Sequence, residues 1–417
     1  MTSEIDFDLS SEEFWERPPA ERDTAFAHLR AIEPFAFFEE PEVPIIERGP
    51  GYYAVTRHAD VEHISSNPQL FCSGKGAVSI PDLPMEWQEF YGSMISMDEP
   101  RHATIRGTVS RAFTPRMLER LVDSVEVLTR EVLVSARAKA LAGDGTFDFV
   151  SEVAAPIPLT VICTMMGIPE ADRATVLAQS NIILSGGDPE FVSSPEEAIG
   201  LFIGAGQQLA DLMSRLSEEK RAHPTDDLTS ALVNPGEDGA TLTPQEIASF
   251  FILLCVAGNE TTRNAISHGV HLLDRNPDQR AAWMGDPSLA KTAVEEIVRF
   301  ASPVRWMRRT ATQDVTIGDR SFPEGTKMIL FYSSANRDDR VFDEPDRFDI
   351  GRSPNPHVGF GAHGPHFCLG AHLARREITV AFRELFAVMP DLRVVGEPDL
   401  LRSSFVNGIK RMVVQVG

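Results

Sequence analysis

The stretch Phe360-Gly361-Ala362-His363-Gly364-Pro365-His366-Phe367-Cys368-Leu369-Gly370 is the most informative part of this 417-residue chain. It places one cysteine in a glycine-rich loop, directly before a run with a helical pattern at residues 371–377. Loop amides and the N-terminus of that helix would stabilise a thiolate at Cys368. Gly364 and Gly370 let the backbone approach a large flat group closely. The loop therefore fits a protein that holds a haem iron through sulfur.

Two other interpretations of this loop remain open when its residues are taken alone. A free cysteine is most often a small buried apolar side chain. Four residues also have the short spacings of a zinc site, namely His363, His366, Cys368 and His372. The choice between haem, zinc and a structural cysteine depends on the rest of the chain.

The composition argues against several classes of protein. With 39 basic and 61 acidic residues the net charge is −22, which disfavours binding to nucleic acid and to anionic membranes. The four cysteines are far apart, so we expect no disulfide framework and a cytoplasmic location. The acidic N-terminus lacks an apolar segment, and the longest apolar run, Phe250–Ala257, is far shorter than the roughly 20 residues of a membrane span. We therefore expect no membrane anchor.

The chain reads as a single, mainly α-helical domain over residues 1–417, with a small β part. No repeat or linker divides it, and we expect a short mobile tail over about residues 1–10. Strand patterns occur only at residues 51–56, 314–317 and 327–331.

A long helix is predicted near the middle of the chain. Thr243-Pro244-Gln245-Glu246 has the form of a capping box, and the helical pattern continues to Arg275. Its centre contains Ala257-Gly258-Asn259-Glu260-Thr261-Thr262, where a glycine and polar residues weaken the helix. Such a local inconsistency is typical of functional sites, although outward-facing polar residues and close packing at Gly258 would also explain it.

The cysteine loop resembles the ligand loop of the cytochrome P-450 family, Phe-Gly-x-Gly-x-His-x-Cys-x-Gly. Gly364, His366, Cys368 and Gly370 match in register, whereas Phe360 stands eight residues before the cysteine instead of seven. The resemblance implies a mainly α, single-domain fold with the long helix over haem b. It also implies that Cys368 ligates the iron and that Phe360 packs near the sulfur.

The segment Ala257–Thr262 is similar to the oxygen-activation motif of the same family. The resemblance implies that the helix opens over the haem at Ala257. It further implies that Glu260 connects to a proton supply and that Thr261 hydrogen-bonds the oxygen on the iron. This acid–alcohol pair points to a monooxygenase that uses O2 and electrons, and not to a peroxygenase.

Glu296 and Arg299 stand at i and i+3 on one helix face. An exposed pair of this kind contributes little to stability. The pair also matches the Glu-x-x-Arg motif of the family, which implies a buried ion-pair network with Arg347 as the third member. In a buried network of this kind the loss of one partner is strongly destabilising.

Four basic residues match the family positions that bind the haem propionates: His102, Arg106, Arg309 and His366. Arginine suits carboxylates because its planar fork donates two hydrogen bonds. Each residue alone would more often be an ordinary surface residue. Their common register with the cysteine loop makes the resemblance specific.

The resemblance implies ferredoxin and ferredoxin reductase as electron donors. A basic docking face is expected from Arg111, Arg116, Arg375 and Arg376.

Apolar residues at family pocket positions predict a lipid-like substrate: Val256, Val304, Trp306, Met307 and Phe405. The whole sequence looks most like mycobacterial members of the family that oxidise chain ends. We therefore expect terminal hydroxylation of a methyl-branched or isoprenoid lipid. Hydroxylation of a sterol side chain or a polyketide, and a non-catalytic haem gas sensor, remain alternatives.

Overall fold

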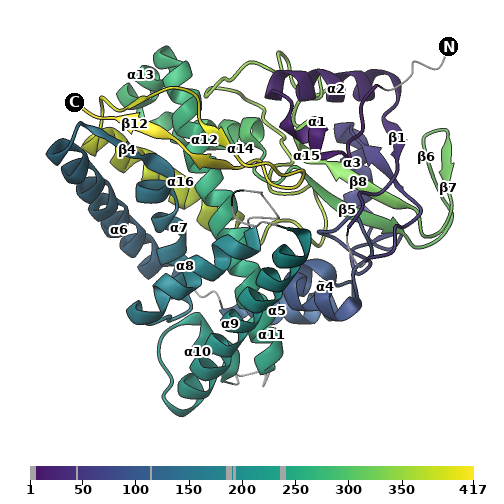
Figure 1. The fold of residues 1–417 in the computed structure, drawn as a ribbon, viewed down its shortest axis with the longest axis horizontal. Coiled ribbons are helices and arrows are strands. Elements are labelled where there is room, and N and C mark those ends of the chain that lie inside the picture. The colour runs from purple at the N-terminus through teal and green to yellow at the C-terminus, as the bar shows by residue number, and fades with distance from the viewer. Residues whose placement is uncertain (1–5, 44–45, 113–114, 185–189, 191–193, 235–240) are drawn as a thin grey trace.

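The computed structural model describes residues 6–43, 46–112, 115–184, 190, 194–234 and 241–417, without the side chains of 115–124, 184, 195 and 196. Within these ranges helices dominate (Figure 1). The α-helices are α1 (Glu12–Glu16), α2 (Pro19–Ile32), α3 (His58–Ser66), α4 (Met85–Gly92), α5 (Arg101–Ala112), α6 (Pro115–Ala142), α7 (Pro156–Met165), α8 (Glu170–Leu184), α9 (Pro195–Ala222), α10 (Leu228–Val233), α11 (Pro244–Leu253), α12 (Thr261–Arg275), α13 (Pro277–Gly285), α14 (Ala290–Ala301), α15 (Tyr332–Ala335) and α16 (Ala371–Val388).

Shorter helical segments connect several of these helices. The 3-10 turns are η1 (Ser93–Ser96) and η4 (Pro287–Leu289), and the π-helical segments are η2 (Val150–Ala154) and η3 (Leu254–Glu260). No helix in the described ranges is both long and apolar enough to cross a membrane.

The strands are few and short. They are β1 (Phe35–Phe38), β2 (Tyr52–Val55), β3 (Phe71–Cys72), β4 (Thr146–Asp148), β5 (Trp306–Ala311), β6 (Val315–Ile317), β7 (Arg320–Phe322), β8 (Lys327–Phe331), β9 (Arg393–Val394), β10 (Asp399–Leu400), β11 (Ile409–Arg411) and β12 (Val413–Gln415). The three predicted strand regions are thereby confirmed as β2, β6 and β8.

The main sheet has the strand order β1-β2-β8-β5-β3, and only β2 and β8 run parallel. It lies beside α1 and α2 on one side of the molecule, while most helices fill the other side (Figure 1). Three strands form a second sheet in the order β4-β12-β9, and β6-β7 and β10-β11 form hairpins. The mainly α architecture with a small β part is as predicted.

The predicted central helix is formed by α11, η3 and α12 in direct succession. Its capping box is present, because the Thr243 hydroxyl accepts the Glu246 amide at 3.2 Å and the Glu246 carboxylate accepts the Thr243 amide at 2.9 Å. The helix is not uniform, however, since the seven residues Leu254–Glu260 are π-helical. A π-helical turn widens the backbone locally and is common at functional sites.

The C-terminal part of the expected mobile tail packs against the rest of the domain. Leu9 is buried, and its carbonyl accepts the indole N–H of Trp15 at 2.8 Å. The Ser10 hydroxyl donates to the carbonyl of Glu39 and lies 3.1 Å from the hydroxyl of Tyr52. Apolar burial therefore fixes this segment, and residues 1–5 lie outside the described residues.

Candidate active site

The cysteine loop ends directly at the first turn of α16, as predicted from the sequence. The amide of Cys368 donates to the carbonyl of Phe360 at 3.0 Å, which closes the loop at its base. Gly364 has φ +150°, and a Cβ there would lie 2.3 Å from the backbone oxygen of Ser65. A Cβ at Gly370 would meet nothing within 4 Å. Gly364 is thus required by the fold, whereas Gly370 leaves open space beside the cysteine.

The surroundings of the sulfur act on its ionisation in opposite directions. Desolvation raises the pKa of the Cys368 thiol, although the residue is partly accessible. The amide of Gly370 and the charges of Arg106 and Arg375 lower that pKa. A bound cation or metal would likewise stabilise the Cys368 thiolate and lower the pKa of the thiol.

The zinc alternative finds no support in the structure. Among the described residues no group of three or more His, Cys, Asp and Glu side chains could hold a metal ion. The His363 side chain is 89% exposed and lies 3.6 Å from a carboxylate oxygen of Glu62. The histidines of the loop therefore do not converge on Cys368.

Basic side chains from three elements gather next to the loop. The rings of His102 on α5 and His366 lie 4.3 Å apart, and Nε2 of His102 is buried without a hydrogen-bond partner among the described residues. Arg106 donates to the carbonyl of Phe367 at 2.7 Å, and Arg309 on β5 is buried. Burial and then the charges of Arg309, His102 and Arg106 lower the pKa of His366 to about 2.

This basic cluster lacks matching acids. In the described part of the chain no carboxylate forms an ion pair with Arg106, Arg309 or His366, and only Glu99 contacts His102, at 3.0 Å. Arg309 is a buried cation of this cluster, and a buried positive charge without a partner is costly. The cluster, the unpaired Nε2 of His102 and the open space at Gly370 fit a flat cofactor with two acidic groups, such as haem.

The predicted acid and alcohol stand where η3 passes into α12. The Thr261 hydroxyl donates to the carbonyl of Ala257 at 2.5 Å. Glu260 is buried, and its Oε1 accepts from Arg263 and, at 2.8 Å, from Asn264. Its Oε2 is buried without a partner among the described residues. No sequence pattern indicated Arg263 and Asn264, because their role depends on the direction of the Glu260 side chain.

Gly258 also has a packing role. A Cβ at this position would lie 3.1 Å from Cδ1 of Ile162 on α7, which is tighter than most such contacts. Asn259 is fully buried, and neither polar atom of its side chain has a partner in the described residues. Close packing and unpaired polar groups therefore occur side by side in η3.

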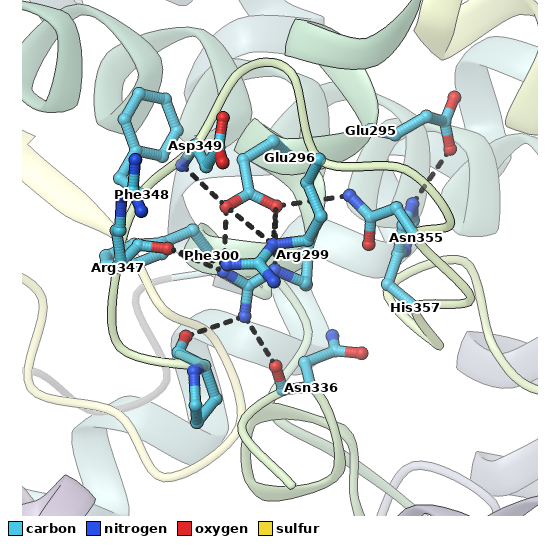
Figure 2. Close-up of polar contacts among 12 residues, drawn as sticks. Glu295, Glu296, Arg299, Phe300, Asn336, Arg347, Phe348, Asp349, Asn355 and His357 are labelled. Carbon is cyan, nitrogen blue, oxygen red and sulfur yellow. Dashed lines mark hydrogen bonds and ion pairs between the residues drawn. The ribbon is translucent and has the colours of Figure 1, made fainter. Parts of the chain in front are cut away.

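Glu296 and Arg299 on α14 form a fully buried ion pair (Figure 2). Two parallel contacts join them, Nε–Oε2 at 2.7 Å and Nη2–Oε1 at 2.8 Å. Arg299 also donates to the carbonyls of Asn336 and Pro345, each at 2.8 Å. The pair thereby ties α14 to the long segment that precedes the cysteine loop.

The third member of this network was predicted incorrectly. The side chain of Arg347 is largely exposed and bonds Glu344 at 2.9 Å, so only its carbonyl contacts Arg299. Arg352 instead reaches Glu296, with Nε 3.2 Å from Oε2. The path of the turn between the two arginines decides which one points inward, and the sequence does not encode this path locally.

The predicted pocket residues fall into groups: Val304 and Met307 pack against one apolar cluster, and Trp306 and Phe405 lie at another. Trp306 and Met307 are neighbours on β5, so their side chains point to opposite faces. Trp306 is 3% exposed, packs in the core beneath α1 and α2, and contacts Phe405 edge-on at 4.9 Å. Trp306 therefore lies in the core of this side of the molecule, and its place in a substrate pocket stays a prediction.

The other three lie on separate elements. Val304 forms a β-bridge with Val406, Met307 packs on the opposite face of the sheet from Trp306, and Val256 is part of η3.

The predicted docking face is largely paired with acids. Arg375 bonds Glu295 and Arg376 bonds Glu126, which reduces their net positive charge. Arg111 contacts the Thr108 hydroxyl at 3.4 Å, and the side chain of Arg116 lies outside the described residues.

Known proteins share both this geometry and the sequence. A model of the cytochrome P-450 family matches residues 287–387. A methyl-branched lipid omega-hydroxylase of Mycobacterium tuberculosis is 47% identical, covering 98% of this chain and 94% of the relative. A steroid C26-monooxygenase of Mycolicibacterium smegmatis is 37% identical, covering 99% and 94% respectively. The solved structure of a Mycobacterium marinum cytochrome P-450 in complex with pseudoionone has a TM-score of 0.92 at 40% identity, covering 98% of both chains.

The chain therefore belongs to the cytochrome P-450 family, and it is a monooxygenase. Membership implies a haem-thiolate cofactor, O2 and redox partners. The alternative of a non-catalytic gas sensor is set aside by these matches.

Proposed function

We propose that this monooxygenase holds haem b through the Cys368 thiolate and hydroxylates the end of a methyl-branched or isoprenoid lipid chain. The observation that carries the cofactor assignment is the basic cluster beside the loop, which lacks matching acids. In this proposal His102, Arg106, Arg309 and His366 bind the two propionates. When bound, haem supplies insertion of one atom of O2 into a C–H bond, using two electrons and two protons, while the other atom leaves as water.

In this proposal Glu260 and Thr261 bind and transfer protons beside Ala257. The Thr261 hydroxyl uses its own proton to bond the Ala257 carbonyl, so its lone pairs remain free to accept a hydrogen bond from water. Oε2 of Glu260 has no partner in the described part of the chain, and a water or a proton there would satisfy it. Arg263 and Asn264 keep the carboxyl group in position.

The substrate class rests on the relatives. The 47% identical protein is named a methyl-branched lipid omega-hydroxylase, which supports attack at a chain end. The 37% identical protein is named a steroid C26-monooxygenase, so a sterol side chain is the second candidate. Apolar residues near η3 and β5, such as Val256, Val304 and Met307, are compatible with either lipid.

Ferredoxin and ferredoxin reductase are the proposed electron donors. An iron–sulfur centre needs a set of cysteines, and Cys72, Cys163 and Cys255 are buried on separate elements. The described residues thus offer no cysteine set for an iron–sulfur centre.

The reduced, CO-bound absorption spectrum tests the cofactor assignment. We expect a red-shifted Soret band of the thiolate type, and its loss in Cys368→Ser. Its absence in the unaltered protein would overturn the proposal.

In Thr261→Ala we expect electron consumption to continue while product per electron falls roughly 10-fold or more, since a positioned proton-transfer group contributes about 100-fold or more. Unchanged coupling would contradict the role of Thr261.

Titration with a panel of lipids tests the substrate class. Substrate-type spectral shifts with branched fatty chains and products oxidised at the terminal carbon are the expected result. Tighter binding of sterols would favour the second candidate, and products hydroxylated only at internal carbons would refute terminal attack.

A further inference from the structure

A backbone hydrogen bond joins Phe360 to Cys368, although the loop is one residue longer than the family pattern. Its carbonyl accepts the cysteine amide at 3.0 Å, and the Gly361 amide donates to Val358 at 2.9 Å. Gly361 has φ +83°, a conformation that glycine adopts without strain. The additional residue is thus absorbed within the loop, and the base formed by Phe360 and Cys368 stays closed. Any displacement of Phe360 therefore displaces the backbone of the cysteine.

The ring of Phe360 is covered by a cation from α16. The guanidinium carbon of Arg375 lies 4.3 Å from the ring centroid, within the range of a favourable cation–π contact. Arg375 is half-buried and stands seven residues after the cysteine, on the first turns of the helix that follows the loop. The side chain therefore connects the helix that follows the loop to the ring of Phe360 at the start of the loop.

Glu295 holds this guanidinium in place through two contacts. Nε of Arg375 lies 2.5 Å from Oε1 and Nη2 lies 2.9 Å from Oε2, which is the paired geometry typical of strong arginine–carboxylate contacts. Burial opposes ionisation of Glu295, but the hydrogen bonds of His357 and Arg375 outweigh it and lower its pKa to about 2. Glu295 is therefore ionised at neutral pH.

His357 completes the arrangement from the segment before the loop. Its Nδ1 accepts the amide of Gly359 at 3.1 Å, so its proton must lie on Nε2, which donates to Oε2 of Glu295 at 2.8 Å. The ring of His357 is buried and lies 5.9 Å from that of Phe360. Figure 2 shows Glu295 and His357 beside the Glu296 network.

Two neighbouring carboxylates on α14 thus serve different segments. Glu296 binds Arg299, Arg352 and the segment up to Asn355, whereas Glu295 binds His357 and Arg375. We infer that the Glu295–Arg375 pair, which packs against Phe360, is a second element that positions the cysteine loop. The pair thereby influences how the sulfur acts as an axial ligand. This inference rests on the proposed assignment of Cys368 as the haem ligand.

Arg375→Gln tests the inference, and Arg376→Gln is the matched control. Arg376 is the next residue, loses the same charge and bonds Glu126 on α6 instead of the loop. In Arg375→Gln we expect the thiolate-type band of the reduced CO complex to be lost about fivefold faster in mild denaturant, as a contact worth about 1 kcal/mol predicts. We also expect a shifted midpoint reduction potential. Arg376→Gln should change neither.

Arg375→Lys distinguishes the effect of the positive charge at position 375 from the effect of the planar guanidinium geometry. A lysine keeps the ion pair but lacks the planar fork, so we expect an intermediate rate of band loss. Equal behaviour of Arg375→Gln and Arg376→Gln would overturn the inference. If Arg375→Gln does not fold, Phe360→Leu gives the same test, because it removes the ring and leaves the ion pair. Unchanged band loss and potential in Phe360→Leu would then overturn the inference.

The two proposals fail in different ways. A missing thiolate-type band in the unaltered protein would defeat the assignment of Cys368. A normal band with no difference between the Arg375 and Arg376 variants would defeat only the positioning role.

Discussion

Arg352 reaches the buried carboxylate of Glu296, with Nε 3.2 Å from Oε2, while Arg347 points to the surface. The Arg352 side chain is itself only 9% exposed, and it also donates to the carbonyl of Asp343 at 2.7 Å. It therefore joins α14 to the segment that leads to the cysteine loop. The acid on α14 thus has two cationic partners, and they come from different parts of the chain.

This difference predicts unequal effects of two arginine substitutions. Arg352→Ala should lower the free energy of unfolding by about 1.5–3 kcal/mol, because it removes hydrogen bonds to a buried charge. Arg347→Ala should cost under about 1 kcal/mol, since its ion pair with Glu344 is exposed. Urea unfolding of both variants measures the difference. Equal losses of unfolding free energy in the two variants would show that burial does not decide which arginine joins the Glu296–Arg299 pair.

Alanine substitutions at the two glycines of the cysteine loop, Gly364 and Gly370, should also lower the free energy of unfolding by unequal amounts. Gly364→Ala forces a Cβ against the backbone oxygen of Ser65 at a positive φ, so we expect a loss of about 1–3 kcal/mol or more. Gly370→Ala meets no protein atom within 4 Å and serves as the control. Thermal unfolding of both variants is the measurement. A Gly370→Ala variant as unstable as Gly364→Ala would contradict this explanation.

Glu377 on α16 predicts a pH-dependent stability. Burial raises its pKa to about 8, and its Oε2 has no hydrogen-bond partner among the described residues. The folded state therefore binds this proton more tightly than the unfolded state, whose glutamate pKa is about 4.3. Its contribution to stability is complete below about pH 4 and decreases as the pH rises towards 8.

We accordingly expect the free energy of unfolding to fall between pH 5 and 8, by up to about 1.4 kcal/mol per pH unit from this group. Glu377→Gln should remove that slope, because glutamine does not titrate. Urea unfolding of the two proteins at four pH values provides the comparison. Parallel curves would show that Glu377 is not protonated in the folded protein.

A second buried ion pair, far from the cysteine loop, predicts a rescue experiment. Nζ of Lys327 on β8 lies 2.5 Å from Oε1 of Glu40, and both side chains are almost fully buried. Lys327→Met should cost about 3–5 kcal/mol, because Glu40 loses a buried cationic partner. The double variant Glu40→Gln, Lys327→Met should recover much of this loss. No recovery would mean that Lys327 acts through Asp82, which lies 2.9 Å away.

Features that depend on short spacings along the chain could be predicted from the amino-acid sequence. The capping box at Thr243 and Glu246, the pair Glu296 and Arg299, and the cysteine loop before α16 are each set within a few residues. Helical and strand periodicities likewise indicated the mainly α architecture, because they follow from local backbone geometry. These predictions needed no knowledge of how distant segments meet.

Contacts between side chains that are far apart in the chain could be seen only once the fold was known. Arg352 in place of Arg347, the core position of Trp306 and the contact of Glu295 with Arg375 all depend on the paths of connecting segments. The ordered position of Leu9 depends on packing against helices that follow it. A sequence pattern shows that a residue can pair or pack, but the backbone path and the exclusion of water select its partner.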